Sequence, residues 1–146
     1  MNISKHFTLK EATVTTTRLD NTPDNDEDLA TIQRTAMRME AIREFLGGPI
    51  IINSWYRSTT VNTAVGGVAN SQHKLGEAVD FVCPTYGSPY KICKALENYL
   101  VEFEIDQLIL EPTWVHISFC TSRKNRDRKP RYQVLTKTPS GYSKGL

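Results

Sequence analysis

The 146-residue sequence contains no long hydrophobic run and no internal repeat. No stretch approaches the ~18 apolar residues that a membrane-spanning helix requires, and residues 1–17 contain nothing like the apolar region of a secretory signal peptide. We therefore expect no transmembrane segment and no export of this chain through the general secretory route. With 39% hydrophobic and 23% charged residues, the composition argues against a disordered or fibrous chain and is typical of a globular domain.

Cysteine is also scarce, with one residue at each of positions 83, 93 and 120. These residues form no C-x-x-C pair, and an odd number leaves one unpaired, so neither a disulfide framework nor a zinc ribbon is indicated. We expect all three to be small buried residues. Histidine is limited to three residues, and His6 stands alone in the N-terminal segment, where a surface position is expected.

The charge is unevenly distributed, although the formal net charge is only +2. Residues 1–122 carry ten Lys/Arg against fifteen Asp/Glu, whereas residues 123–146 carry eight Lys/Arg against Asp127 alone. The basic segment 123–131 could bind nucleic acid, attract an anionic cell wall or membrane surface, or be a solvated extension. We favour the solvated extension over nucleic-acid binding, because only Tyr132 offers an aromatic platform for a base.

The apolar periodicity predicts an α+β domain in which helices pack on a small antiparallel sheet. The longest helix begins at the acidic residues 24–28 and ends before Gly47. We place one domain at residues 1–136, including a wrapping arm at 1–25, and a polar C-terminal tail at 137–146. Shorter helices are expected at 8–12, 59–65 and 88–100, and strands at 50–52 (buried), 76–84, 107–111, 114–120 and 132–136.

Three side chains of the metal-ligating type stand out: His73, Asp80 and His116. Asp80 lies within the apolar strand 78–82, where its charge needs a partner if it is buried. His116 alternates with apolar residues, so it shares a half-polar strand face with Trp114. A catalytic zinc uses three imidazole or carboxylate ligands and keeps one position open. From the residues alone, an ion pair between Asp80 and Arg57 is an equally good interpretation.

The same strand alternation indicates a proton acceptor. Strands 107–111 and 114–120 are separated by Pro112-Thr113, which predicts a hairpin in which Glu111 lies opposite Trp114. Glu111 is then diagonal to His116 on the same face, a separation of ~7–8 Å that a long side chain can span. Glu111 is therefore the carboxylate best placed to accept a proton from water at a metal.

The motif Ser71-x-His73-x-x-Gly76-x-Ala78-x-Asp80, followed by Trp114-Val115-His116, resembles the zinc D-Ala-D-Ala carboxypeptidase family, whose fold is shared with hedgehog signalling domains. The resemblance covers residues 1 to about 120 and includes Tyr56-Arg57-Ser58 and Val65-Gly66-Gly67. It is strongest to short, single-domain members from bacteria and bacteriophages, some of which are endolysins.

The resemblance implies a zinc cleft on one sheet face, with one zinc ion held by His73, Asp80 and His116. It also implies that Arg57 and Ser71 bind substrate. Trp55 stands where many members have a small residue, so we expect the pocket wall beside Arg57 to differ. Some branches place the catalytic acid three residues before the second histidine, where this chain has Thr113, and Glu111 is the expected equivalent.

The implied activity is zinc-dependent hydrolysis of peptide bonds in the peptidoglycan stem peptide, of the carboxypeptidase or endopeptidase type. The alternative is a non-catalytic, zinc-stabilised module that binds the cell wall. We expect a monomer with no specific nucleic-acid partner. Without a signal peptide, a protein made in the cytoplasm would reach the wall by a phage-type release through a lysed membrane.

Overall fold

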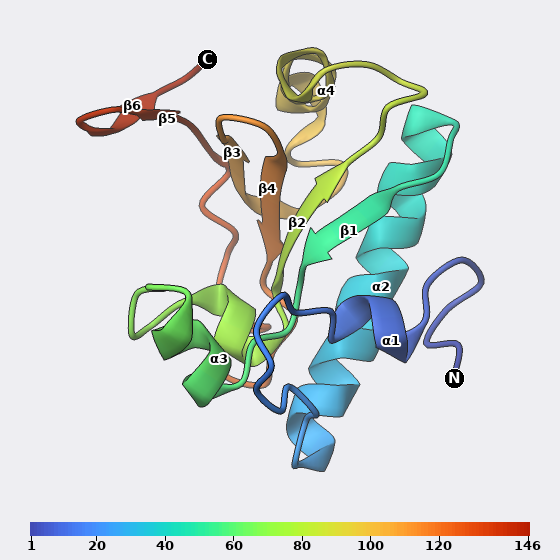
Figure 1. Cartoon of the computed structure of the whole chain (residues 1–146). Coiled ribbons are helices and arrows are strands. Elements are labelled where there is room, and N and C mark those ends of the chain that lie inside the picture. The colour runs from blue at the N-terminus through green and yellow to red at the C-terminus, as the bar shows by residue number, and fades with distance from the viewer.

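A six-stranded sheet forms the centre of the fold in the computed structural model, which describes all residues 1–146 (Figure 1). The strand order is β1-β2-β4-β3-β5-β6, and every neighbouring pair is antiparallel except β3 and β5, which are parallel. The α+β architecture is thus confirmed, with one parallel pair added to the predicted antiparallel sheet. The strands are β1 (Ile51–Ser54), β2 (Ala78–Val82), β3 (Ile105–Leu110), β4 (Val115–Phe119), β5 (Gln133–Thr138) and β6 (Gly141–Lys144).

The longest helix, α2 (Asp26–Leu46), packs on the core face of the sheet together with α4 (Pro89–Leu96) (Figure 1). Asn25 caps α2 through its side chain, three acids occupy the first turn, and Gly47 ends the helix in the left-handed conformation. None of the helices is both long and apolar enough to cross a membrane. The remaining helical segments are α1 (Leu9–Ala12), α3 (Thr59–Ala64) and the 3-10 turns η1 (Gln72–Leu75) and η2 (Glu97–Tyr99).

The two faces of the central strands have different roles. Val79 and Phe81 of β2 are fully buried in the hydrophobic core, together with Ile117 of β4. Alternation along the strands turns Asp80 and His116 to the opposite face, which α2 and α4 leave uncovered. The sheet is therefore covered on one face and available for a site on the other.

Gly76 illustrates how closely the segment before β2 approaches α2. Its φ angle is 81°, and a Cβ atom built there would lie 2.8 Å from the side chain of Ile32. Both the left-handed backbone and the close approach favour glycine. This turn sets the point at which the chain enters β2 after η1.

Two buried carboxylates anchor the segment that follows β4. Glu77 accepts hydrogen bonds from the backbone N–H groups of Thr121 and Ser122. Asp106 is fully buried and accepts hydrogen bonds from the guanidinium groups of Arg128 and Arg131. The prediction that segment 123–131 is a solvated extension is therefore wrong for Arg128 and Arg131, which neutralise a charge inside the fold.

Local differences from the predicted elements occur at the sheet edges. β1 is an edge strand with Ile51 52% exposed, so the expectation of a buried strand there is wrong. The α-helix expected over 88–100 ends at Leu96 and continues as η2. Residues 137–146, predicted as a polar tail, form the end of β5 and the whole of β6, which pair as a hairpin. Backbone pairing sustains this hairpin although its sequence is mostly polar.

The ion-pair cluster at Asp106 generates a prediction about stability. Burial would raise the pKa of Asp106, but the hydrogen bonds and charges of Arg131 and Arg128 hold it well below its usual range. Asp106→Asn should lower the free energy of unfolding at pH 7 by about 2–4 kcal/mol, because both arginines lose their anionic partner. A carboxyl whose pKa is lowered in the folded state contributes stability above its unfolded pKa of about 4 and loses it at lower pH.

The measurement is urea unfolding of wild type and variant at pH 7 and at pH 3. The difference between the two proteins should shrink at pH 3, where the wild-type carboxyl loses part of its advantage. Asp127→Asn, at an exposed position in the same segment, is the control and should change stability little at either pH. An equal difference at both pH values would contradict the assignment.

Candidate metal centre

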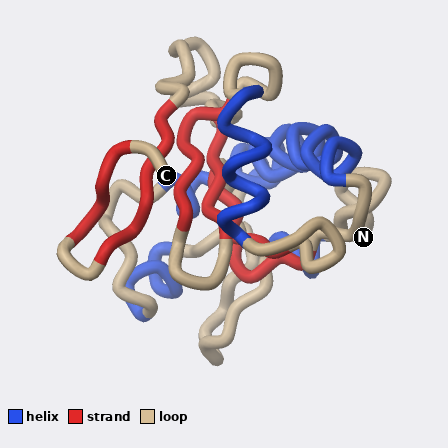
Figure 2. The backbone as a smooth tube through the Cα atoms, turned by 90° about the horizontal axis from the view of Figure 1, so that it is seen from above, coloured by secondary structure: helices blue, strands red, loops and turns tan.

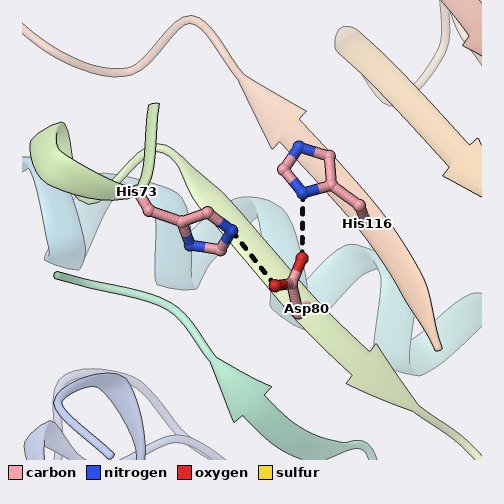
Figure 3. Close-up of side chains that lie close together, drawn as sticks. All are labelled: His73, Asp80 and His116. Atoms are coloured by element: carbon pink, nitrogen blue, oxygen red, sulfur yellow. Dashed lines mark hydrogen bonds and ion pairs between the residues drawn. The ribbon is translucent and has the colours of Figure 1, made fainter. Parts of the chain in front are cut away.

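His73, Asp80 and His116 converge on the uncovered face of the sheet (Figure 3). Asp80 and His116 are direct partners in the pairing of β2 with β4, and His73 comes from η1, just before β2. His73 Nε2 lies 3.2 Å from Asp80 Oδ2, and His116 Nδ1 lies 2.8 Å from Asp80 Oδ1. One ligand atom from each residue lies within 4.8 Å of the other two.

The orientation of His73 is set by two hydrogen bonds from neighbouring segments. The Ser71 hydroxyl caps η1 by accepting a hydrogen bond from the His73 backbone N–H. The His73 Nδ1 atom lies 2.6 Å from the backbone carbonyl of Trp55. Because a carbonyl can only accept, Nδ1 carries the proton and Nε2 is free to face Asp80.

Trp55 therefore contributes through its backbone and not through its ring. The ring is fully buried, makes an edge contact with Phe7, and donates from Nε1 to the carbonyl of Gly76. It does not line the cleft, so the expectation that Trp55 alters the wall beside Arg57 is wrong. The role of its carbonyl is not predictable from the sequence, since a backbone acceptor leaves no side-chain signal.

The electrostatics of Asp80 and His73 favour the protonation states that bind a metal. Burial alone would raise the pKa of Asp80, but the interactions with His73 and His116 hold it well below its usual range, so Asp80 is ionised. Burial lowers the pKa of His73 and outweighs the attraction of Asp80, so the neutral imidazole is favoured. An ionised carboxylate and a neutral imidazole are the forms that bind a metal.

The geometry and the donor set fit a zinc ion. Tetrahedral bonds of ~2.0–2.2 Å place ligand atoms about 3.4 Å apart, close to the separations between Asp80 and the two histidines. Two imidazoles and one carboxylate are a common ligand set for catalytic zinc, which keeps a fourth position open. His6, by contrast, is exposed and paired with Glu40, which confirms its expected surface position. The three cysteines are free, and Cys120 is only partly buried.

Arg57 borders the centre from the segment after β1. Its Nη2 atom lies 3.5 Å from Asp80 Oδ2, while its other nitrogens donate to Ser54 and Asn62. Burial lowers the pKa of Arg57 and the charge of Asp80 raises it, but the guanidinium remains a cation. The ion pair considered as an alternative to the metal site thus coexists with the ligand cluster.

Glu111 lies where the strand pattern predicts. Its backbone N–H donates to the carbonyl of Trp114, and the pairing of Ile109 with His116 puts Glu111 diagonal to that histidine. The side chain is half-buried beside the cleft. Burial raises the pKa of Glu111, the nearby His116 lowers it, and Asp80 raises it further, which leaves a net increase. A carboxyl with a raised pKa is better suited to exchange protons near neutral pH.

A cleft of about 540 Å³ connects these residues. It is lined by His73, Asp80 and His116, by Glu111, and by residues of the loop 65–71, which includes Ser71. Leu135 of β5 and Tyr142 of β6 line it as well. The position of Tyr142 in the cleft differs from the prediction of a polar tail at 137–146, because strand pairing with β5 brings it there.

Comparison with known proteins agrees with the geometry of the site. A family model described as Peptidase M15 matches residues 5–118. A 54-residue region is 39% identical to the zinc D-Ala-D-Ala carboxypeptidase of Streptomyces albus G. This region is 36% of the chain and 21% of that protein, so the chain aligns with about a fifth of its relative's length. Because the family model covers most of the chain, the protein belongs to the M15 peptidase family.

Proposed function

We propose that this protein is a zinc-dependent peptidase that hydrolyses peptide bonds in the stem peptide of peptidoglycan. The observation that carries the proposal is the Glu111 carboxylate, which shares one cleft with the cluster of His73, Asp80 and His116. Membership of a peptidase family and the similarity to a zinc D-Ala-D-Ala carboxypeptidase support the choice of metal and substrate. The bacterial cell wall is then the site of action.

In this proposal His73, Asp80 and His116 hold one zinc ion. Zinc bound there would polarise the scissile carbonyl and lower the pKa of water toward ~7. Glu111 accepts a proton from the attacking water at a carboxylate oxygen and returns it to the leaving amine. The half-buried position of Glu111 beside His116 supports both steps, because the carboxyl faces the cleft while its pKa is raised.

Arg57 and Ser71 bind the substrate in this proposal. The Arg57 guanidinium presents a fixed positive charge at the cleft, suited to a substrate carboxylate or to negative charge that develops on the carbonyl oxygen. Ser71 lines the same cleft next to His73. The proposal covers release of a terminal D-alanine and cleavage of an internal stem bond, and digestion of defined muropeptides distinguishes the two.

Removal of the proposed base tests the activity. Glu111→Gln should lower kcat by about 10²–10⁴-fold, because proton transfer is lost while size and shape are kept. Release of fragments from purified peptidoglycan is followed by mass spectrometry, together with zinc content. Glu102→Gln, at an exposed position outside the cleft, is the control and should keep the wild-type rate.

Two results would contradict this proposal. Full activity of Glu111→Gln would remove Glu111 as the base. A wild-type protein that binds zinc and peptidoglycan but releases no fragment would instead be the non-catalytic wall-binding module.

Removal of one ligand tests the metal site. The wild-type chain should bind one zinc ion, measured by mass spectrometry after dialysis, and His116→Ala should weaken zinc binding by at least about 100-fold. His116 is only partly buried, so the variant should still fold. His6→Ala removes an exposed histidine and is the matched control, which should bind zinc as the wild type does. Equal zinc content in all three proteins would contradict the assigned site.

A further inference from the structure

The β5–β6 hairpin lies outside residues 5–118, to which the family model applies, yet it forms one wall of the cleft. β5 pairs with β3 in parallel, with Ile109 opposite Leu135 and Leu110 opposite Thr136. In Figure 2 the hairpin occupies the side of the molecule away from the N-terminus. The hairpin thus extends the site-bearing face of the sheet beyond β3.

The register of the strands brings three side chains into one row. Continuing the β3–β5 register by one residue beyond Leu110 and Thr136 brings Glu111 next to Lys137, and Lys137 is the direct partner of Tyr142 in the β5–β6 pairing. Because residues in one row across a sheet point to the same face, all three side chains lie on the face of the cleft. Glu111 and Tyr142 both line the cleft.

The contacts within this row link Tyr142 to Glu111. The Tyr142 phenol and the Glu111 carboxyl lie near enough to alter each other's pKa, and the Lys137 ammonium lies 5.0 Å from the centre of the Tyr142 ring. A cation at this distance over an aromatic face restrains the ring. Tyr142 is 57% exposed, so its ring has no place in the hydrophobic core that would explain its position.

We propose that Tyr142 is a positioning residue whose hydroxyl holds the Glu111 carboxylate in the cleft, while Lys137 holds the Tyr142 ring. This inference rests on the proposed function, because it assigns a role to Tyr142 through the proposed base. Glu111 follows the last residue of β3 and precedes a two-residue turn, so its side chain needs such a partner to keep one orientation. The hairpin then completes the site.

The kinetic test uses full-length, zinc-loaded protein and a soluble stem peptide. Tyr142→Phe removes only the hydroxyl and should lower kcat about five- to tenfold with KM within twofold of the wild type, because the ring that lines the cleft is kept. Lys137→Met should lower kcat by a smaller factor, because the Tyr142 ring loses the cation that restrains it. The melting temperature and zinc content should equal those of the wild type in both variants.

Two control variants make the same kinds of substitution at positions outside the cleft. Tyr90→Phe removes a hydroxyl from another exposed tyrosine, on α4. Lys129→Met removes a lysine that also lies over a tyrosine ring, at 5.8 Å from the centre of Tyr132. Both controls should keep the wild-type kcat. A kcat of Tyr142→Phe within twofold of the wild type would overturn the inference, as would a raised KM with unchanged kcat.

A second measurement does not require activity. Burial raises the pKa of the Tyr142 phenol, and the negative charges of Glu111 and Asp80 raise it further. Carbon NMR of ring-labelled tyrosine, with Tyr142→Phe for assignment, should show this pKa falling in Glu111→Gln. An unchanged phenol pKa would overturn the contact. If the wild-type protein did not hydrolyse the stem peptide, the proposed function would be refuted. The NMR comparison would still show whether Tyr142 contacts Glu111.

Discussion

The site depends on one charge, that of Asp80, placed between the core residues Val79 and Phe81. Strand alternation turns the Asp80 carboxylate away from the core, yet only 5% of its surface is exposed. Such a carboxylate is costly to bury unless partners compensate for its lost hydration. Arg57 and His116 supply part of that compensation, and a cation held between Asp80 and the unprotonated Nε2 of His73 would supply the rest. The requirement to satisfy Asp80 therefore brings together the residues that a metal would need.

Much of this arrangement could be predicted from the sequence, because strand periodicity is a local property. Val115 and Ile117 identify the core face of β4, so His116 has to lie on the other face. Because the Pro112-Thr113 turn has two residues, Glu111 on β3's side of the hairpin lies on the same face as His116. The neighbouring strand β2 shows the same pattern around Asp80. These inferences need only the alternation of side chains and a hairpin of known length.

Other parts of the site could not be predicted because they depend on distant segments. The carbonyl of Trp55 orients His73 across 18 residues of sequence, and a backbone acceptor has no signature in residue type. β5 pairs in parallel with β3, and the segment between β4 and β5 is held by Glu77 and Asp106. Local apolar patterning contains no information about such a non-local strand pairing.

The folded structure also changes the meaning of the charge distribution. The basic residues after position 122 look like one cationic tail in the sequence, but they belong to different environments. Arg128 and Arg131 neutralise Asp106 inside the fold, and Lys137 lies over Tyr142 beside the cleft. The surface segment 123–129 is therefore less cationic than the sequence suggests, since one of its arginines is paired. The hairpin that follows this segment contributes Leu135 and Tyr142 to the lining of the cleft, although it lies beyond residue 118, where the family match ends.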